Sequence, residues 1–383
     1  MLTRTGWWAA ATAAFLVGAH LLVGGVVLLA IAATLVVALL VGLATVLRRP
    51  EVSAYQSLSP AVVGVGDRAT ALVRAANRGR RTTPPLVASD LIDGVSHAVS
   101  LPSLAPGETT TAQLALSTER RGVFTVGPLQ IDLRDPFGLF AVTTHRGSQV
   151  SLTVHPEIHH MAPLPTGHRR ELEGVTTNRP QEGGISFHSL REYVPGDDLR
   201  LVHWRSVARQ PDGELMVRKN VVTSEPRLMV VLDTSADPYD DESFEDAVRL
   251  AASLVVAGCE SRYPVMLRTT AGQGVDVGPS GDRRQDALTL LAGVTRSSDD
   301  PGLNGVVRFA ERVEGVSLGA VTGQPQPDRT VGITRSRPRF DMVTVIQVGE
   351  SFDRPPMQIP GALVVNGADS AQVASRWQAR FGR

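Results

Sequence analysis

A short run of oxygen-bearing side chains is the first feature of this sequence that could do chemistry. Asp233-Thr234-Ser235-Ala236-Asp237 places a carboxylate, a hydroxyl and a second carboxylate at alternate positions. Hard divalent cations such as Mg²⁺ prefer oxygen ligands of this kind. Asp233, Ser235 and Asp237 are therefore candidate metal ligands, and Mg²⁺ is the candidate cofactor. The alternative interpretation is that Asp233 and Ser235 only cap the segment that follows them.

A complete metal site also needs ligands from loops that are distant in the sequence. Four later residues with suitable oxygens could supply them, although their positions alone select none of them. These candidate suppliers are Thr295, Asp299, Asp300 and Thr322.

The densest group of ionisable side chains lies just before this run, between residues 183 and 226. Its histidines and carboxylates could form a general acid–base site, for example His203 with Asp197. The same side chains could instead form arginine–carboxylate pairs that fix the segment against a sheet, and this structural interpretation is favoured here. The group comprises His188, Arg191, Glu192, Asp197, Asp198, Arg200, His203, Trp204, Arg205 and Arg209.

Strands and helices that alternate over residues 185–383 would position these side chains. Residues 227–235 form a continuous apolar run that ends in small polar residues, typical of a buried parallel strand. In 240–261 the apolar residues recur at helical spacing and acidic residues crowd the first turn. This alternation predicts an open α/β sheet with helices on both faces, where ligands bind beyond the carboxyl ends of the strands. Further strands are expected at 264–269, 317–322, 342–348 and 362–365, and helices at 284–294, 303–313 and 369–381.

Residues 51–160 have a different pattern, in which short alternating runs are separated by turn sequences such as "APGE" at 105–108. Alternation of this kind is typical of antiparallel strands, and six or seven of them predict a β-sandwich-like domain. It carries no catalytic cluster and is interpreted as a structural or docking module. A polar linker is expected at 162–184, between this domain and the α/β domain at 185–383.

Residues 7–47 contain no Asp, Glu, Lys or Arg. A single bilayer crossing needs about 20 residues, so this run is long enough for two. Gly24-Gly25 lies near its middle and offers a place to turn, which predicts a transmembrane hairpin of two helices. Arg4 precedes the first crossing and Arg48-Arg49 follow the second. Positive charge at both ends predicts a multi-pass protein of the cell membrane with its soluble domains in the cytoplasm.

The composition argues against several other classes of protein. Lys and Arg balance Asp and Glu at 38 each, and aromatic residues are only 5% of the chain, so no basic aromatic surface for nucleic acid is expected. The arginine-rich segment "RGRR" at 78–81 is interpreted as a solvated loop. Cys259 is the only cysteine, which excludes an internal disulfide and a cysteine-rich zinc site.

Three segments of the sequence resemble the family catalogued as domain of unknown function 58. The longest is "FHSLREYVPGDDLRLVHWRSVAR" at 187–209. The others are "VVLDTS" at 230–235 and "ERRGVFTVGPLQIDLRDPFGLF" at 119–140. The resemblance implies a von Willebrand factor A-like α/β domain attached to a membrane hairpin and a β-domain. It also implies partners, namely MoxR-type AAA+ ATPases and other membrane proteins.

The resemblance also bears on the metal ligands. In the A-type fold the metal site carries the pattern Asp-x-Ser-x-Ser, which corresponds here to Asp233 and Ser235. The third position is Asp237 instead of serine, so the pattern is incomplete.

These observations together predict a membrane-anchored protein-binding or adaptor module, and not an enzyme. It would act with a MoxR-type AAA+ ATPase in the assembly or maturation of membrane or envelope complexes, through a Mg²⁺-dependent A-type loop. One alternative is a hydrolase that uses His203 and Asp197, although the sequence lacks a nucleophile elbow and a phosphate-cradling glycine loop. The other alternative is a purely architectural envelope protein.

Overall fold

A computed structural model describes most of the chain. It covers residues 2–47, 51–92, 95–166, 185–195, 197, 202–208, 215–222, 226–311, 313, 315–349 and 358–382. The chain divides into two compact units, Met1–Pro156 and Glu157–Arg383.

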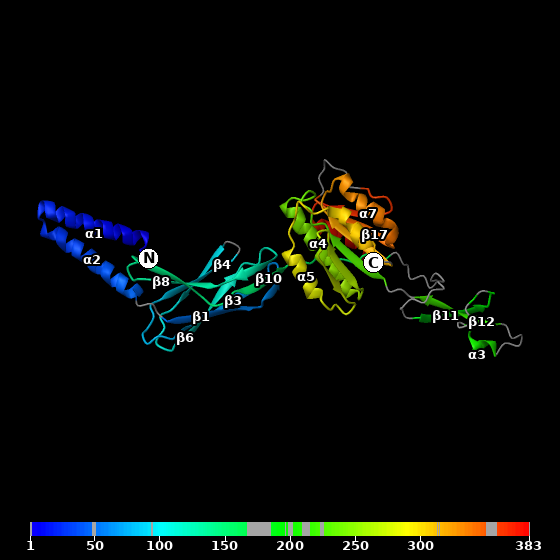
Figure 1. Cartoon of the computed structure of the whole chain (residues 1–383), viewed down its shortest axis with the longest axis horizontal. Coiled ribbons are helices and arrows are strands. Elements are labelled where there is room, and N and C mark those ends of the chain that lie inside the picture. Colours follow the sequence, from blue (N-terminus) through cyan, green and yellow to red (C-terminus); the bar gives the residue numbers. More distant parts are fainter. Residues whose placement is uncertain are drawn as a thin grey trace. The chain divides into compact units, whose positions relative to one another are not determined.

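The first unit begins with two apolar helices, α1 (Arg4–Val23) and α2 (Val26–Leu47), which lie side by side (Figure 1). Gly24 ends α1 in the left-handed conformation at φ 73°, and its N–H donates to the His20 carbonyl, so the turn falls where the sequence predicts it. At about 1.5 Å per residue both helices match a hydrocarbon core of about 30 Å. Trp7 is 68% exposed and Leu22 is 88% exposed. Both helices are therefore long and apolar enough to span a membrane.

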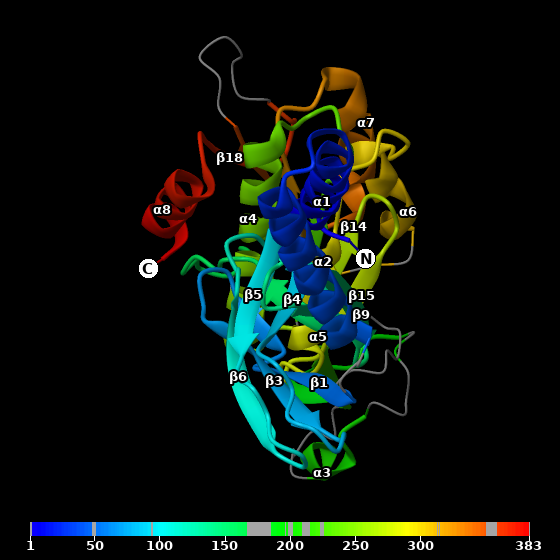
Figure 2. The same cartoon turned by 90° about the vertical axis from the view of Figure 1, so that its left-hand side faces the viewer.

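The rest of the first unit consists of three antiparallel or mixed sheets. Their strand orders are β1-β3-β6, β2-β10-β7 and β5-β4-β8-β9. Strands β1, β3 and β6 can be followed in Figure 2. The strands are β1 (Val52–Ser59), β2 (Val62–Gly64), β3 (Ala69–Asn77), β4 (Leu86–Ile92), β5 (Val95–Leu101), β6 (Thr109–Leu116), β7 (Gly122–Val126), β8 (Leu129–Arg134), β9 (Ala141–Arg146) and β10 (Val150–His155).

Strand β3 explains why these sheets pack as a sandwich. Its odd-numbered residues are buried on one face, as the alternating pattern requires. Ala71, in the first half of β3, packs with Val126 and Leu152 of the small sheet. Val73 and Ala75, in the second half, belong to a separate core cluster together with residues of β4 and β8. One strand thus supplies both halves of the sandwich core.

The helical hairpin is joined to the loop between β8 and β9. The Thr3 N–H donates to the Leu139 carbonyl at 2.9 Å, and Val46 of α2 is buried with Leu139 and Phe140. Gly42 lies so close to this loop that an added Cβ would stand 3.0 Å from an oxygen of Asp135. The start of α1 and the end of α2 are therefore fixed to the same edge of the β-sandwich.

The second unit is built on a six-stranded sheet of order β15-β14-β13-β16-β17-β18, in which only β15 is antiparallel. Successive residues of β13 point to opposite faces: Leu228 and Val230 pack under α4, α5 and α8, whereas Met229 and Val231 pack under α6 and α7. This confirms an α/β sheet covered on both faces. The strands are β13 (Arg227–Leu232), β14 (Val265–Thr269), β15 (Gly274–Val277), β16 (Val316–Thr322), β17 (Met342–Val348) and β18 (Leu363–Gly367). The helices are α4 (Asp241–Glu260), α5 (Arg284–Gly293), α6 (Val307–Ala310), α7 (Val331–Ser336) and α8 (Ser370–Phe381), with 3₁₀ turns η2 (Gly302–Val306), η3 (Pro327–Thr330) and η4 (Arg337–Arg339).

Residues 157–164 form a strap that packs on α4 and α8. Met161 and Leu164 are buried in the core of the second unit, and the Trp377 indole N–H donates to the Ala162 carbonyl at 2.7 Å. The first unit thus ends at Pro156, a few residues before the predicted boundary at 160. The described start of the predicted linker, 162–166, packs on the sheet because its apolar side chains complete this core. The remainder of that linker, 167–184, lies outside the described residues.

A separate two-stranded sheet precedes β13 in the chain. It pairs β11 (Ile185–Glu192) with β12 (Met216–Val222) in antiparallel register. Helix α3 (Trp204–Val207) lies between them in the sequence, and Val202 forms an isolated bridge with Val217. Most of the polar group predicted at 183–226 therefore belongs to this hairpin and its connection.

Candidate functional site

Polar side chains gather where neighbouring strands of the six-stranded sheet end. Asp233 follows β13 directly, Thr270 follows β14, and Thr322 is the last residue of β16. These three strands are parallel, so their carboxyl ends meet at one edge of the sheet. From β13 the chain passes first to β14, on one side of β13 in the sheet, and later to β16, on its other side. Such a topological switch point is where open α/β sheets bind ligands.

Asp233 is the centre of the first part of this site. One of its carboxylate oxygens accepts from the Ser235 backbone N–H at 3.0 Å and from the Ser235 hydroxyl at 2.7 Å. The other accepts from the Thr322 hydroxyl at 2.8 Å. The side chain is 1% exposed, and burial raises the pKa of Asp233, with the nearby charge of Asp300 adding to the rise. The described donors that hold this carboxylate in place are all neutral.

Asp300 forms the second part of the site and is also buried. One oxygen accepts from the hydroxyls of Thr234 and Thr270, at 2.5 and 2.9 Å. The other accepts from the Gly302 N–H at 2.8 Å. Gly302 has φ +62°, and a Cβ there would lie 3.0 Å from the Ser235 hydroxyl. Glycine is required because the backbone turns sharply against the Asp233 cluster.

The rim of the site ties three loops together. Asp237 pairs with the Arg329 guanidinium at 2.8 Å, and Arg329 also donates to the Asp300 carbonyl at 3.2 Å. The Tyr239 hydroxyl donates to the Asp233 carbonyl at 2.9 Å. Burial raises the pKa of Tyr239 well above its usual value, and the charge of Asp233 adds to this. The phenol therefore stays protonated and acts as a donor.

A hard cation at this site would be bound by the Asp233 carboxylate together with hydroxyl oxygens. Among the residues that the structure describes, no three His, Cys, Asp or Glu side chains are grouped so as to hold a metal ion. The Ser235 and Thr322 hydroxyls both contact the Asp233 carboxylate, and a hydroxyl that donates its proton keeps lone pairs to offer. These three side chains fit Mg²⁺, which prefers oxygen ligands. Asp237 is turned instead toward Arg329.

The structure brings together some of the residues that the sequence singles out. Asp233 and Ser235 contact each other, and two of the candidate suppliers, Asp300 and Thr322, belong to the same network. The side chains of the other two candidates, Thr295 and Asp299, are exposed. Sequence reasoning missed Thr270, although its position immediately after a parallel strand could have indicated it. It also missed Arg329, for which no pattern in the sequence indicates a place in the site.

Two described contacts of the ionisable group before β13 are local ones. Asp197 accepts from the Val194 N–H at 3.0 Å within its own turn, and His203 contacts the Ser206 hydroxyl at 2.8 Å. Trp204 is 63% exposed, so it does not lock this segment into a core. Glu192 and Arg205 are exposed as well. The side chains of His188, Arg191, Asp198, Arg200 and Arg209 lie outside the described residues.

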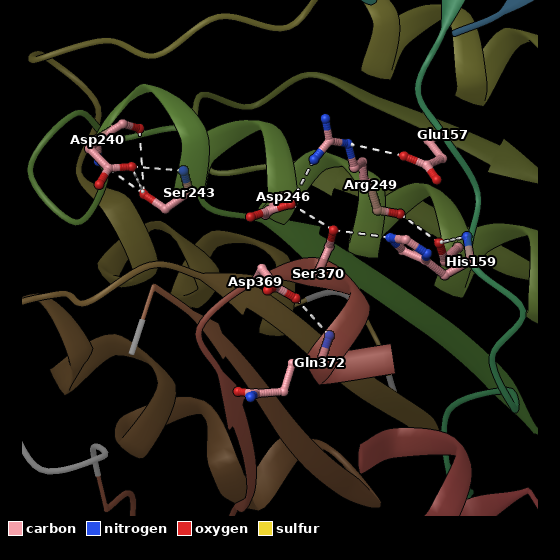
Figure 3. A network of polar contacts seen from close by, with 10 residues as sticks. Glu157, His159, Asp240, Ser243, Asp246, Arg249, Asp369, Ser370 and Gln372 are labelled. Atoms are coloured by element: carbon pink, nitrogen blue, oxygen red, sulfur yellow. Dashed lines mark hydrogen bonds and ion pairs between the residues drawn. The ribbon is translucent and has the colours of Figure 1, made fainter. Parts of the chain in front are cut away.

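A histidine, a serine and an aspartate do meet elsewhere, where the strap packs on α4 and α8 (Figure 3). The Ser370 hydroxyl donates to Asp246 at 2.6 Å, and His159 Nε2 lies 3.0 Å from the same hydroxyl. In a nucleophilic triad the serine proton goes to the histidine, whereas here it goes to the carboxylate. Ser370 is also buried. This group therefore fastens the strap to α4 and α8, together with the pair of Arg249 and Glu157.

Comparison with known proteins gives a family for part of the chain. Residues 189–307 match the family described as Protein of unknown function DUF58, which confirms the resemblance carried by the motifs at 187–209 and 230–235. This region includes α3, β12, β13, Asp233 and Asp300. No match was found among curated proteins.

Several solved structures show weak similarity to this chain. The CARDB domain of the PF1109 protein from Pyrococcus furiosus is 18% identical with a TM-score of 0.22, covering 27% of this chain and 93% of that one. The C-terminal domain of wzt is 14% identical with a TM-score of 0.22, covering 29% and 81%. Cwp6 from Clostridium difficile is 10% identical with a TM-score of 0.19, covering 87% and 56%. Scores this low carry no argument about the fold or function of this chain.

The raised pKa of Asp233 predicts a specific dependence of stability on pH. Because the folded state favours the protonated carboxyl, its contribution to stability is complete below the unfolded pKa, near 3.8, and is lost as pH rises through the folded pKa. Asp233→Asn removes this loss while retaining an acceptor for Ser235. We expect the variant to gain stability relative to the parent chain as pH rises from about 4 to about 8, measured by urea unfolding. Asp299→Asn, at an exposed carboxylate, is the control, and a constant difference between Asp233→Asn and the parent would contradict the prediction.

Proposed function

We propose that this protein is a membrane-tethered adaptor whose α/β unit presents the loops at the carboxyl ends of β13 and β16 to a partner protein. The observation that carries the proposal is the buried network of Asp233 and Asp300, which draws loops from four parts of the chain into one preorganised surface. A surface of this kind loses little loop entropy when a partner binds. The two apolar helices would hold that surface at a cell membrane, with the soluble units in the cytoplasm.

The proposed partner is a MoxR-type AAA+ ATPase, and the proposed setting is the assembly or maturation of membrane or envelope complexes. This partner and setting are those that the sequence resemblance implies, and the strand order puts the site at a switch point, where open α/β sheets bind ligands. Mg²⁺ would be held by Asp233, Ser235 and Thr322. When bound, the ion would supply positive charge for an acidic side chain of the partner. Arg329 adds a guanidinium at the rim, where it pairs with Asp237.

We propose that the protein is not an enzyme. The hydrolase alternative would use His203 and Asp197, and the sequence offers neither a nucleophile elbow nor a phosphate-cradling glycine loop beside them. The architectural alternative needs no partner at the switch-point loops, so it predicts that no ATPase is retained by any form of the protein. A metal-dependent surface instead predicts that retention is lost when Asp233 is replaced.

The test is capture of the ATPase by the full-length chain, extracted from membranes in mild detergent. The parent, Asp233→Asn and the matched control Asp299→Asn are compared in the presence of Mg²⁺ and ATP, and retained proteins are identified by mass spectrometry. We expect the MoxR-type ATPase with the parent and the control, and at least about tenfold less with Asp233→Asn, as for a binding hot spot. Unchanged retention by Asp233→Asn would support a surface that works without the metal. Absence of the ATPase from every sample would overturn the adaptor proposal and favour the architectural alternative.

A metal-dependent surface also predicts an effect on the purified chain alone. Mg²⁺ in large excess over its dissociation constant stabilises a folded protein that binds it by about 2–3 kcal/mol. The unfolding temperature of the parent should therefore rise with Mg²⁺ by several degrees, on the order of 5 °C. Asp233→Asn should show no such rise, and equal shifts in parent and variant would exclude these three side chains as the binding site.

A further inference from the structure

We infer that the first unit contains a binding site for the headgroup of an anionic phospholipid. The site is an arginine-lined cleft of about 860 Å³ beside the end of α2, in the size range of small-molecule sites. Its lining includes Thr45 of α2, Glu51, the turn at 78–81 and Arg134 at the end of β8. This inference rests on the proposal that α1 and α2 span a membrane.

The charge of the cleft is strongly one-sided. Among the residues that the structure describes, four arginines and one carboxylate, that of Glu51, line it. The arginines are Arg78, Arg80, Arg81 and Arg134, and all four side chains are exposed. Within the described residues no ion pair involves any of these guanidinium groups; Arg78 donates to the Ser53 hydroxyl at 3.1 Å. Guanidinium groups with this freedom match phosphate oxygens in geometry and charge.

The arginine turn is built rigidly, unlike the solvated loop that the sequence suggests. Asn77 is 1% exposed, and its amide donates to the carbonyls of Arg81 and Leu104 at 2.7 and 2.9 Å. The side-chain carbonyl oxygen of Asn77 accepts from the Gly79 N–H at 2.9 Å. The backbone of 78–81 is thereby closed into a fixed loop whose arginine side chains project outward. A fixed loop loses less entropy on binding an anion than a mobile one.

The position of the cleft selects lipid as the source of the phosphate. Thr45 lies in the last turn of α2, a helix whose 22 residues span roughly the hydrocarbon core, so the cleft lies at the level of the headgroups. The start of α1 is fixed to the neighbouring loop through Thr3 and Leu139. Phe137, in that loop, is 56% exposed, as expected for an aromatic residue at a membrane interface. Basic pockets of this kind beside membrane helices bind anionic headgroups, which are enriched on the cytoplasmic leaflet.

The experiment measures lipid that the purified full-length chain retains. The chain is solubilised in mild detergent, exposed to equal amounts of phosphatidylglycerol and phosphatidylcholine, stripped of loosely bound lipid and analysed by intact-complex mass spectrometry. The variant Arg80→Gln/Arg81→Gln/Arg134→Gln removes three exposed charges from the cleft. The control Arg68→Gln/Arg120→Gln/Arg146→Gln removes three exposed charges near the opposite ends of β3, β6 and β8.

We expect the parent and the control to retain phosphatidylglycerol in preference to phosphatidylcholine. In the cleft variant this preference should fall by roughly fivefold for each arginine removed, since each contributes about 1 kcal/mol near a lipid surface. Equal retention by the cleft variant and the parent would overturn the inference. A second arm adds inorganic phosphate to the parent: displacement of phosphatidylglycerol by phosphate alone would mean that the site takes free phosphate and that the assignment to lipid is wrong. No ATPase is present in this assay, so its failure is distinct from failure of the adaptor proposal.

Discussion

Replacing Asp300 with alanine is expected to lower the free energy of unfolding of the α/β unit by about 3 kcal/mol or more. The substitution leaves the Gly302 N–H and the hydroxyls of Thr234 and Thr270 without their acceptor. Each unsatisfied buried donor costs about 1–3 kcal/mol. The two hydroxyls lie 3.1 Å apart and can partly satisfy each other, so the expected loss is less than the full sum. The variant should also lose capture of the partner, because its loops are no longer held together.

Asp299→Ala is the matched control for this substitution. It removes the neighbouring carboxylate, which is exposed, and should change the free energy of unfolding by no more than about 0.5 kcal/mol. Both variants are compared with the parent by urea unfolding followed by circular dichroism. Equal midpoints for Asp300→Ala and Asp299→Ala would show that the network does not support the loops, and would remove the observation on which the adaptor proposal rests.

The second large effect is expected at Trp377, which is fully buried in α8. Trp377→Ala should destabilise the α/β unit by about 3–5 kcal/mol, as for other large aromatic residues removed from a core. Trp377→Phe should cost less, about 1–2 kcal/mol, because it keeps most of the apolar contact and loses the bond to the Ala162 carbonyl. The strap at 157–164 should then be loosened, which hydrogen exchange of its amides would detect.

Trp204 provides a control of the same residue type. Its side chain is 63% exposed, so Trp204→Ala should change stability by no more than about 0.5 kcal/mol. If Trp377→Phe left exchange in 157–164 unchanged, the strap would be held by Met161 and Leu164 alone. If Trp377→Ala cost no more than Trp204→Ala, the described packing of α8 would be wrong.

The regular elements of the α/β unit could be predicted because their periodicity is strong. The strand predicted at 342–348 coincides with β17, and the helix predicted at 240–261 differs from α4 by one residue at each end. The short strand β15 and helix α7 were not predicted. Strand β15 has four residues and helix α7 has six, which are too few for a strand or helix periodicity to stand out. The region predicted as one helix at 303–313 is a 3₁₀ turn followed by a short α-helix, with Gly302 and Gly305 at its start.

The candidate site could be predicted only in part. A residue that follows a parallel strand lies at the same sheet edge as the others, which is why Thr322 was a reasonable candidate beside Asp233. The bond between Asp300 and Thr234 depends on the path of the loop at 294–301, where Ser297 pairs with Ser235 as an isolated bridge. No local pattern encodes such a bridge, and the pairing of Arg329 with Asp237 depends in the same way on where two loops meet.

The interpretation of "RGRR" as a solvated loop illustrates another limit. The local sequence shows that the arginines are exposed, which is correct. It does not show that Asn77 closes the turn or that Arg134, more than 50 residues later, lines the same cleft. Whether exposed charges form a site depends on contacts between distant strands, and those contacts become visible only in the folded chain.

The bond between Trp377 and Ala162 joins residues that are 215 positions apart, which has a consequence for synthesis of the protein. At about 5–20 residues per second, a ribosome needs roughly 10–40 s to pass from one to the other. The apolar helices and the β-sandwich are complete before that interval ends. Met161 and Leu164, in contrast, are not covered until α8 has been synthesised. A nascent chain therefore carries an unfinished apolar surface until its last helix emerges. Chains that terminate before α8 should be preferred substrates for chaperones and proteases.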